Sequence, residues 1–137
     1  MTLSQLAHTL PNALHDARLF GISISFIAGT AVLDFAIDVS TDEMDGYFED
    51  AEIRLSGLRA IVLDAPGVMG PMLNALHVRD TETDAQCYPA YLSVSEHLRY
   101  MYYSLHLAHP CNTYMHIAAE SAEIEWKKDS RREGSAR

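Results

Sequence analysis

The feature that most constrains the fold of this chain is a two-residue alternation of apolar and polar side chains across residues 22–39. The apolar positions are Ile22, Ile24 and Phe26 in the first half and Ala31, Leu33, Phe35, Ile37 and Val39 in the second. Successive side chains of a β-strand point to opposite faces, so the pattern predicts two strands, each with one buried and one solvated face. Gly29 lies in the link at residues 27–30, which favours an antiparallel hairpin.

Similar patterns predict further strands along the chain. One is expected at residues 51–63, where the apolar phase slips by one residue at Gly57, as it does at a β-bulge. Residues 98–126 are again rich in the apolar and aromatic residues that are typical of strands. Between these regions, prolines and glycines at residues 64–75 predict a loop.

A short helix is expected before the first strand. Leu3, Leu6 and Leu10 recur there at helical spacing, and Thr2 or Ser4 would supply the N-cap. We therefore predict a mainly β fold, which is an antiparallel sandwich, a partly open barrel or a curved sheet, with a short N-terminal helix.

The length of 137 residues and the hydrophobic fraction of 48% predict a single β-rich domain at residues 1–126. Residues 127–137 are polar, and we expect them to form a flexible basic tail. The N-terminus has no secretory-signal pattern, and no apolar run is long enough to span a membrane. Two distant cysteines, Cys87 and Cys111, are expected to be reduced, which predicts a cytoplasmic protein.

The formal net charge of −9 is unevenly distributed. Residues 1–126 carry five basic and seventeen acidic residues, whereas residues 127–137 have a net charge of +3. An acidic body repels phosphate backbones, which argues against a nucleic-acid partner, and it attracts basic proteins. The densest acidic run supplies the candidate partner-binding residues, which are Asp42, Glu43, Asp45, Glu49 and Asp50. Alternatively, these acids only maintain solubility and keep a strand edge unpaired.

Four potential metal ligands lie close together in the sequence, at His106, His109, Cys111 and His116. Histidine and cysteine are preferred zinc ligands, and zinc binds four of them. On an extended strand, however, His106 and His109 are three positions apart and point to opposite faces. We therefore expect no bound metal and no cofactor, and we retain a metal-binding or small-molecule-binding β domain as the alternative function.

Catalytic signatures are weak. His15 and Asp16 are adjacent, but neighbouring side chains rarely orient each other, and no nucleophile motif accompanies them. The sequence contains no glycine-rich phosphate loop, no G-x-S-x-G and no C-x-x-C. A protein that is not an enzyme is therefore expected.

Three segments resemble those of a group of small bacterial proteins. They are L-P-N-A-L-H-D-A at residues 10–17, L-S-G-L at residues 55–58, and M-H-I-A-A at residues 115–119 followed by E-I-E-W at residues 123–126. In order and spacing the set is similar to small all-β immunity proteins of bacterial toxin systems. The segment 107–112 departs from the aromatic-rich pattern of that group. This departure argues against a shared partner more than against a shared fold. The resemblance implies an all-β fold and no catalytic residues.

These observations predict a non-enzymatic protein-interaction module that resembles an immunity protein and inhibits a basic toxin or effector. The partner is expected to be a basic protein rather than a nucleic acid or a membrane. The acids of the run at residues 42–50 would act mainly on the rate of encounter, because charges at the rim of an interface steer association. The oligomeric state and the identity of the partner stay open.

Overall fold

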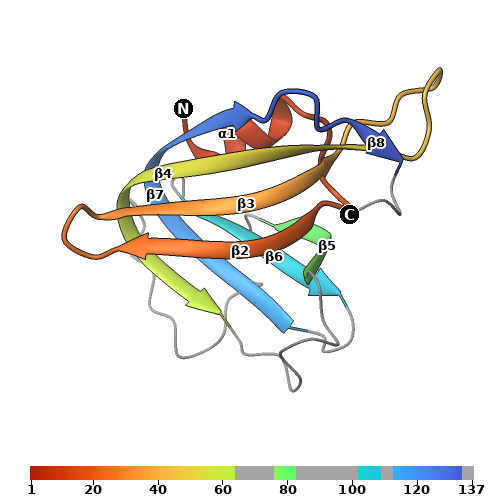
Figure 1. The fold of residues 1–137 in the computed structure, drawn as a ribbon. Coiled ribbons are helices and arrows are strands. Elements are labelled where there is room, and N and C mark those ends of the chain that lie inside the picture. Colours follow the sequence, from red (N-terminus) through yellow and green to blue (C-terminus); the bar gives the residue numbers. More distant parts are fainter. Residues whose placement is uncertain (64–75, 83–101, 109–112, 134–137) are drawn as a thin grey trace.

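The computed structural model describes residues 1–63, 76–82, 102–108 and 113–133 (Figure 1). The short helix α1 (Leu3–His8) begins where the sequence predicted it, after Thr2. The Thr2 hydroxyl accepts a hydrogen bond from the Gln5 amide, and the Gln5 side chain accepts one from the Thr2 amide. This reciprocal capping box satisfies amides that a helix N-terminus otherwise leaves without partners.

Eight strands follow the helix in the described part of the chain. They are β1 (Pro11–Leu14), β2 (Arg18–Ser25), β3 (Thr30–Asp38), β4 (Tyr47–Leu63), β5 (Leu76–Glu82), β6 (Tyr102–Ala108), β7 (Thr113–Trp126) and β8 (Arg132–Glu133). Antiparallel pairings run in the order β2–β3–β4–β7–β6–β5. Strand β5 returns to β2 over two described residue pairs, Arg18–His77 and Leu19–Leu76. The fold is thus mainly β, as predicted, and its strongly curved sheet is only partly closed, because in the described part of the chain β2 and β5 meet over these two residue pairs alone (Figure 1).

Strands β2 and β3 form the predicted antiparallel hairpin, with Ser25 paired to Thr30. Leu33, Phe35 and Ile37 of β3 are fully buried, so the alternation predicted the inner face of this strand correctly. On β2 the prediction holds for Ile22, which packs against the core, but it is wrong further along. The apolar positions near the turn lie outside the core, because the tip of the hairpin projects beyond the rest of the sheet (Figure 1).

The long strand β4 changes partners along its length. Its first half lies between β3 and β7, and its second half pairs with β7 after the Leu58 amide donates a hydrogen bond to the Gly29 carbonyl. The register with β7 shifts between Leu58 and Ala60, one residue beyond the slip that the sequence predicted at Gly57. This irregularity bends β4 and gives the sheet its curvature.

One apolar core fills the curved sheet. Its largest fully buried side chains include Phe35, Ile53 and Ile117, which come from three different strands. Helix α1 covers this core with Leu3, Leu6 and Ala7, and the Met1 carbonyl accepts a hydrogen bond from the Ala122 amide of β7, which ties the chain start to the sheet. No helix in the described residues is long and apolar enough to cross a membrane.

The segment after Trp126 differs from the predicted flexible tail. Arg132 and Glu133 form β8, which pairs with Phe48 and Tyr47 at the start of β4. The prediction failed over residues 127–133 because it considered apolar burial alone, whereas this segment is held by main-chain hydrogen bonds and ion pairs. Residues 134–137 lie outside the described part of the chain.

Candidate functional site

The acidic run lies at the end of the sheet opposite the β2–β3 turn, where β3 connects to β4 (Figure 1). Ser40 organises this connection. Its hydroxyl accepts hydrogen bonds from the amides of Gly46 and Tyr47 at 2.9 and 3.2 Å, and its own amide donates to the Asp38 carboxylate. The Asn12 side chain adds hydrogen bonds to the carbonyls of Asp38 and Ser40. The connection is therefore fixed by hydrogen bonds at both of its ends.

Three of the predicted partner-binding acids project from this connection. Thr41 and Met44 exchange two backbone hydrogen bonds, of 2.8 and 3.1 Å, so that Asp42 and Glu43 occupy the turn between them. Asp42, Glu43 and Asp45 are exposed, and none of them forms an ion pair with the side chains that the structure describes. We call these three residues the acidic connection.

The other two predicted acids, Glu49 and Asp50, are placed differently. They belong to β4, and basic residues of the same chain already bind them. Arg131 lies 2.8 Å from the Glu49 carboxylate, and Arg132 lies 2.7 Å from that of Asp50. The hydrogen bond from Arg132 to Asp50 raises the pKa of the Arg132 guanidinium. Glu49 and Asp50 are therefore paired within the chain, and the partner-binding role of the five acids stays a prediction.

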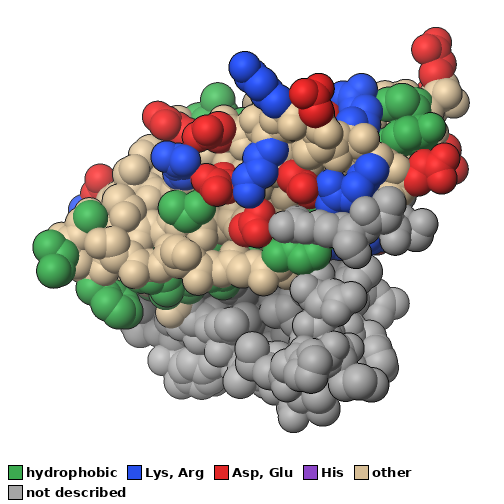
Figure 2. Space-filling view, in the orientation of Figure 1, with side chains coloured by type: hydrophobic (Ala, Val, Ile, Leu, Met, Phe, Trp, Pro, Cys, Tyr) green, Lys and Arg blue, Asp and Glu red, His purple; other side chains and the backbone are tan. Residues whose placement is uncertain are grey.

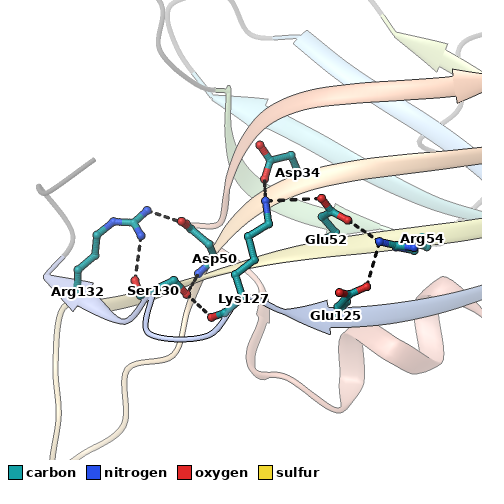
Figure 3. A network of polar contacts seen from close by, with 8 residues as sticks. All are labelled: Asp34, Asp50, Glu52, Arg54, Glu125, Lys127, Ser130 and Arg132. Atoms are coloured by element: carbon teal, nitrogen blue, oxygen red, sulfur yellow. Dashed lines mark hydrogen bonds and ion pairs between the residues drawn. The ribbon is translucent and has the colours of Figure 1, made fainter.

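The outer face of β3, β4 and β7 carries a further chain of ion pairs (Figure 3). Lys127 lies between Asp34 and Glu52, at 3.5 and 3.6 Å, and Arg54 lies 3.0 Å from both Glu52 and Glu125. Acidic and basic side chains therefore alternate on this face, as Figure 2 also shows. Since exposed pairs each contribute little to stability, their main effect is to balance the charge of this face.

A compact set of hydrogen bonds, from the main chain and from the Ser130 hydroxyl, holds residues 127–130 against β4. The Lys127 amide donates to the Asp50 carbonyl at 2.9 Å, and the Asp50 amide donates to the Ser130 hydroxyl at 3.0 Å. That hydroxyl donates in turn to the Lys127 carbonyl at 2.7 Å. The site residues predicted from the sequence did not include Lys127, Ser130, Arg131 and Arg132. The available signal was the basic segment itself, which matches the acids of residues 49–52 in charge.

The potential zinc ligands are only partly described. His109 and Cys111 lie outside the described residues. His106 is on β6 and pairs with Tyr114 of β7. His116 of β7 pairs with Ser104, two residues before His106 on β6. Within the described part of the chain, no three or more His, Cys, Asp or Glu residues are grouped in a way that could hold a metal ion. The expected absence of a metal stays a prediction.

His15 and Asp16 lie in the turn between β1 and β2. The His15 Nε2 atom lies 3.5 Å from the Asp16 carboxylate, and both side chains are mostly exposed. Asp16 has a φ of 60°, a left-handed conformation that Asp adopts more readily than most residues. The pair thus occupies a solvated turn, as expected of residues that satisfy local backbone geometry.

Comparisons with known proteins add one structural likeness. No protein family matches this sequence, and no curated protein matches it. A crystal structure of an uncharacterized protein from Neisseria gonorrhoeae is similar at a TM-score of 0.40 and 16% sequence identity. The likeness covers 81% of this chain and 91% of that one.

Proposed function

We propose that this protein is a non-enzymatic interaction module that binds a basic protein through the end of the sheet where β3 meets β4. The acidic connection carries the proposal. Asp42 and Glu43 lie in a hydrogen-bonded turn and Asp45 follows it. No described basic side chain neutralises these three carboxylates, in contrast to Glu49, Asp50 and Glu52 on the adjacent strand. The potential of an unneutralised cluster extends into solvent over ~8–10 Å at physiological ionic strength, far enough to orient an approaching partner.

The partner class follows from the charge. A net charge of −9 opposes binding to phosphate backbones and favours basic proteins. The resemblance of the sequence to immunity proteins supports a more specific proposal, in which the basic partner is a toxin or effector that this protein inhibits by covering its surface.

The test is the association rate with a partner that is first recovered by pull-down from the native organism. The on-rate is expected to fall steeply with salt, because exposed charges are screened. The variant Asp42→Asn/Glu43→Gln should lower the on-rate at low salt by roughly tenfold and change the off-rate less, since exposed rim charges act mainly on encounter.

A matched control removes two charges elsewhere. Glu120 and Glu123 are exposed on β7, and Glu123 lies opposite Arg54 in the sheet. Arg54 is seven residues along β4 from Tyr47, the first residue of that strand, or roughly 23 Å in an extended strand. Glu120→Gln/Glu123→Gln should therefore change the on-rate much less. An on-rate that is independent of salt, or two variants with equal effects, would contradict the proposal.

A further inference from the structure

One edge of β4 depends on a segment that is distant in sequence. On its first side, β4 pairs with β3 as far as Phe48. On its second side, pairing with β7 begins at Ala51, so the preceding residues need another partner to avoid an open strand edge. Residues 127–133 supply it, through the pairing of β8 with Tyr47 and Phe48 and the hydrogen bond from the Lys127 amide to Asp50.

Two carboxylates on this edge of β4 bind two consecutive arginines. Glu49 and Asp50 are consecutive on β4, so their side chains leave opposite faces of the strand. Arg131 and Arg132 are likewise consecutive, and each binds one of these carboxylates. Arg131 donates to Glu49 through both its Nε and an Nη atom, at 3.1 and 2.8 Å. An extended strand with two adjacent arginines therefore fits this edge on both faces.

Another chain could supply the contacts that residues 127–133 make with β4. Residues 127–133 read K-K-D-S-R-R-E and contain no apolar side chain. Their contacts with β4 are main-chain hydrogen bonds, ion pairs and the hydroxyl of Ser130. Binding by strand addition works in this way, because the main chain provides affinity and alternate side chains provide specificity. The segment thus has the properties of a replaceable ligand.

We propose that the β4 edge at Tyr47–Asp50 is a binding site for an extended, doubly arginine-bearing segment of the basic partner, and that residues 127–133 occupy this site as an internal ligand. The inference rests on the proposed function, since the partner is the same basic protein. Beyond the proposed function, we specify that the partner binds through an extended segment and that this segment docks on the β4 edge. Association begins at the acidic connection, and the partner segment then replaces the internal one on the adjacent strand.

The test uses the full chain and a labelled synthetic peptide with the sequence of residues 127–133. In the variant Arg131→Gln/Arg132→Gln the internal ligand is weakened, and we expect saturable, salt-sensitive binding of the peptide. The wild-type chain should bind it at least about tenfold more weakly, because a tethered ligand competes at an effective concentration on the order of millimolar. A peptide in which both arginines are glutamine should not bind.

Variants that remove acidic side chains show where on the protein the peptide binds. Adding Glu49→Gln/Asp50→Asn to the weakened chain should abolish peptide binding, whereas adding Asp42→Asn/Glu43→Gln should leave the equilibrium affinity within about threefold. A folded variant chain that fails to bind the peptide, or that binds both peptides equally, would overturn the inference. Either result would leave the proposed function standing, because that proposal is tested by the on-rate of the natural partner.

If the variant Arg131→Gln/Arg132→Gln does not fold, amide hydrogen exchange in the wild-type chain provides a second test. With the peptide present at several millimolar, residues 127–133 should lose protection while Tyr47–Asp50 retain theirs, because one strand replaces another. Protection of residues 127–133 that is unchanged by the peptide would show that this segment is a permanent strand of the fold, and it would overturn the inference.

Discussion

At the scale of single residues, Gly57 shows how one position controls the path of β4. Its φ is 64°, in the left-handed region that side chains disfavour. A Cβ atom at this position would lie 2.8 Å from the Cβ of Glu120 on the paired strand. Both features demand glycine where β4 leaves β3 and continues with β7.

We predict that Gly57→Ala lowers the free energy of unfolding by about 2–4 kcal/mol, since backbone strain and a steric clash add. Gly46→Ala is the matched control, because Gly46 has a φ of 74° but open space around it, so it should cost only about 1 kcal/mol. Chemical denaturation measures both. Equal losses in the two variants would show that contact with Glu120 has no part in the requirement.

The two arginines of the docked segment should differ in their contribution to stability. Arg132 and Asp50 keep 18% and 15% of their side-chain surface exposed, whereas Arg131 is 55% exposed. We predict that Arg132→Gln costs about 1–3 kcal/mol and Arg131→Gln less than about 1 kcal/mol, because exposed ion pairs are weak. Thermal unfolding at matched salt measures the difference. A larger loss for Arg131→Gln would contradict the account.

At the scale of elements, the β2–β3 hairpin has a tip that the core does not use. Phe26 is 88% exposed and Ile27 is fully exposed. The turn is nevertheless ordered by hydrogen bonds, from the Ala28 amide to the Ser25 hydroxyl and from the Leu58 amide to the Gly29 carbonyl. The alternation could not reveal this, because it reports which side chains share a face and not how far the sheet extends.

The variant Phe26→Ser/Ile27→Ser is expected to change the free energy of unfolding by no more than about 0.5 kcal/mol, since exposed side chains contribute little. Phe35→Ala, which empties a fully buried position on the next strand, should cost about 3–5 kcal/mol. Denaturation curves of the two variants provide the comparison. A loss above about 1 kcal/mol at the tip would mean that Phe26 or Ile27 packs against the protein.

At the scale of the whole molecule, the sequence predicted the class of fold because local patterns determine it. The capping residue Thr2, the hairpin and the bend near Gly57 each have a local sequence signal that the structure confirms. Long-range pairing has no comparable signal. The contact between Asp50 and Arg132 joins residues 82 positions apart, so the sequence indicated two opposite charges without showing that they meet.

The same distinction applies to the candidate site. The exposure of Asp42, Glu43 and Asp45 follows from their place in a polar turn, which a local pattern can predict. The engagement of Glu49 and Asp50 depends on the return of residues 127–133 to β4. A segment without apolar residues appears dispensable when burial is the only criterion, and its hydrogen bonds become apparent once the sheet is known.

The most direct test of the central claim is to map the footprint of the basic partner on the labelled protein by nuclear magnetic resonance. We predict that amides of the acidic connection, of Tyr47–Asp50 and of residues 127–133 shift or broaden as the partner is added. The hairpin tip at residues 25–29, at the other end of the sheet, should be unaffected. A footprint centred on that tip, with the acidic connection unchanged, would contradict the account.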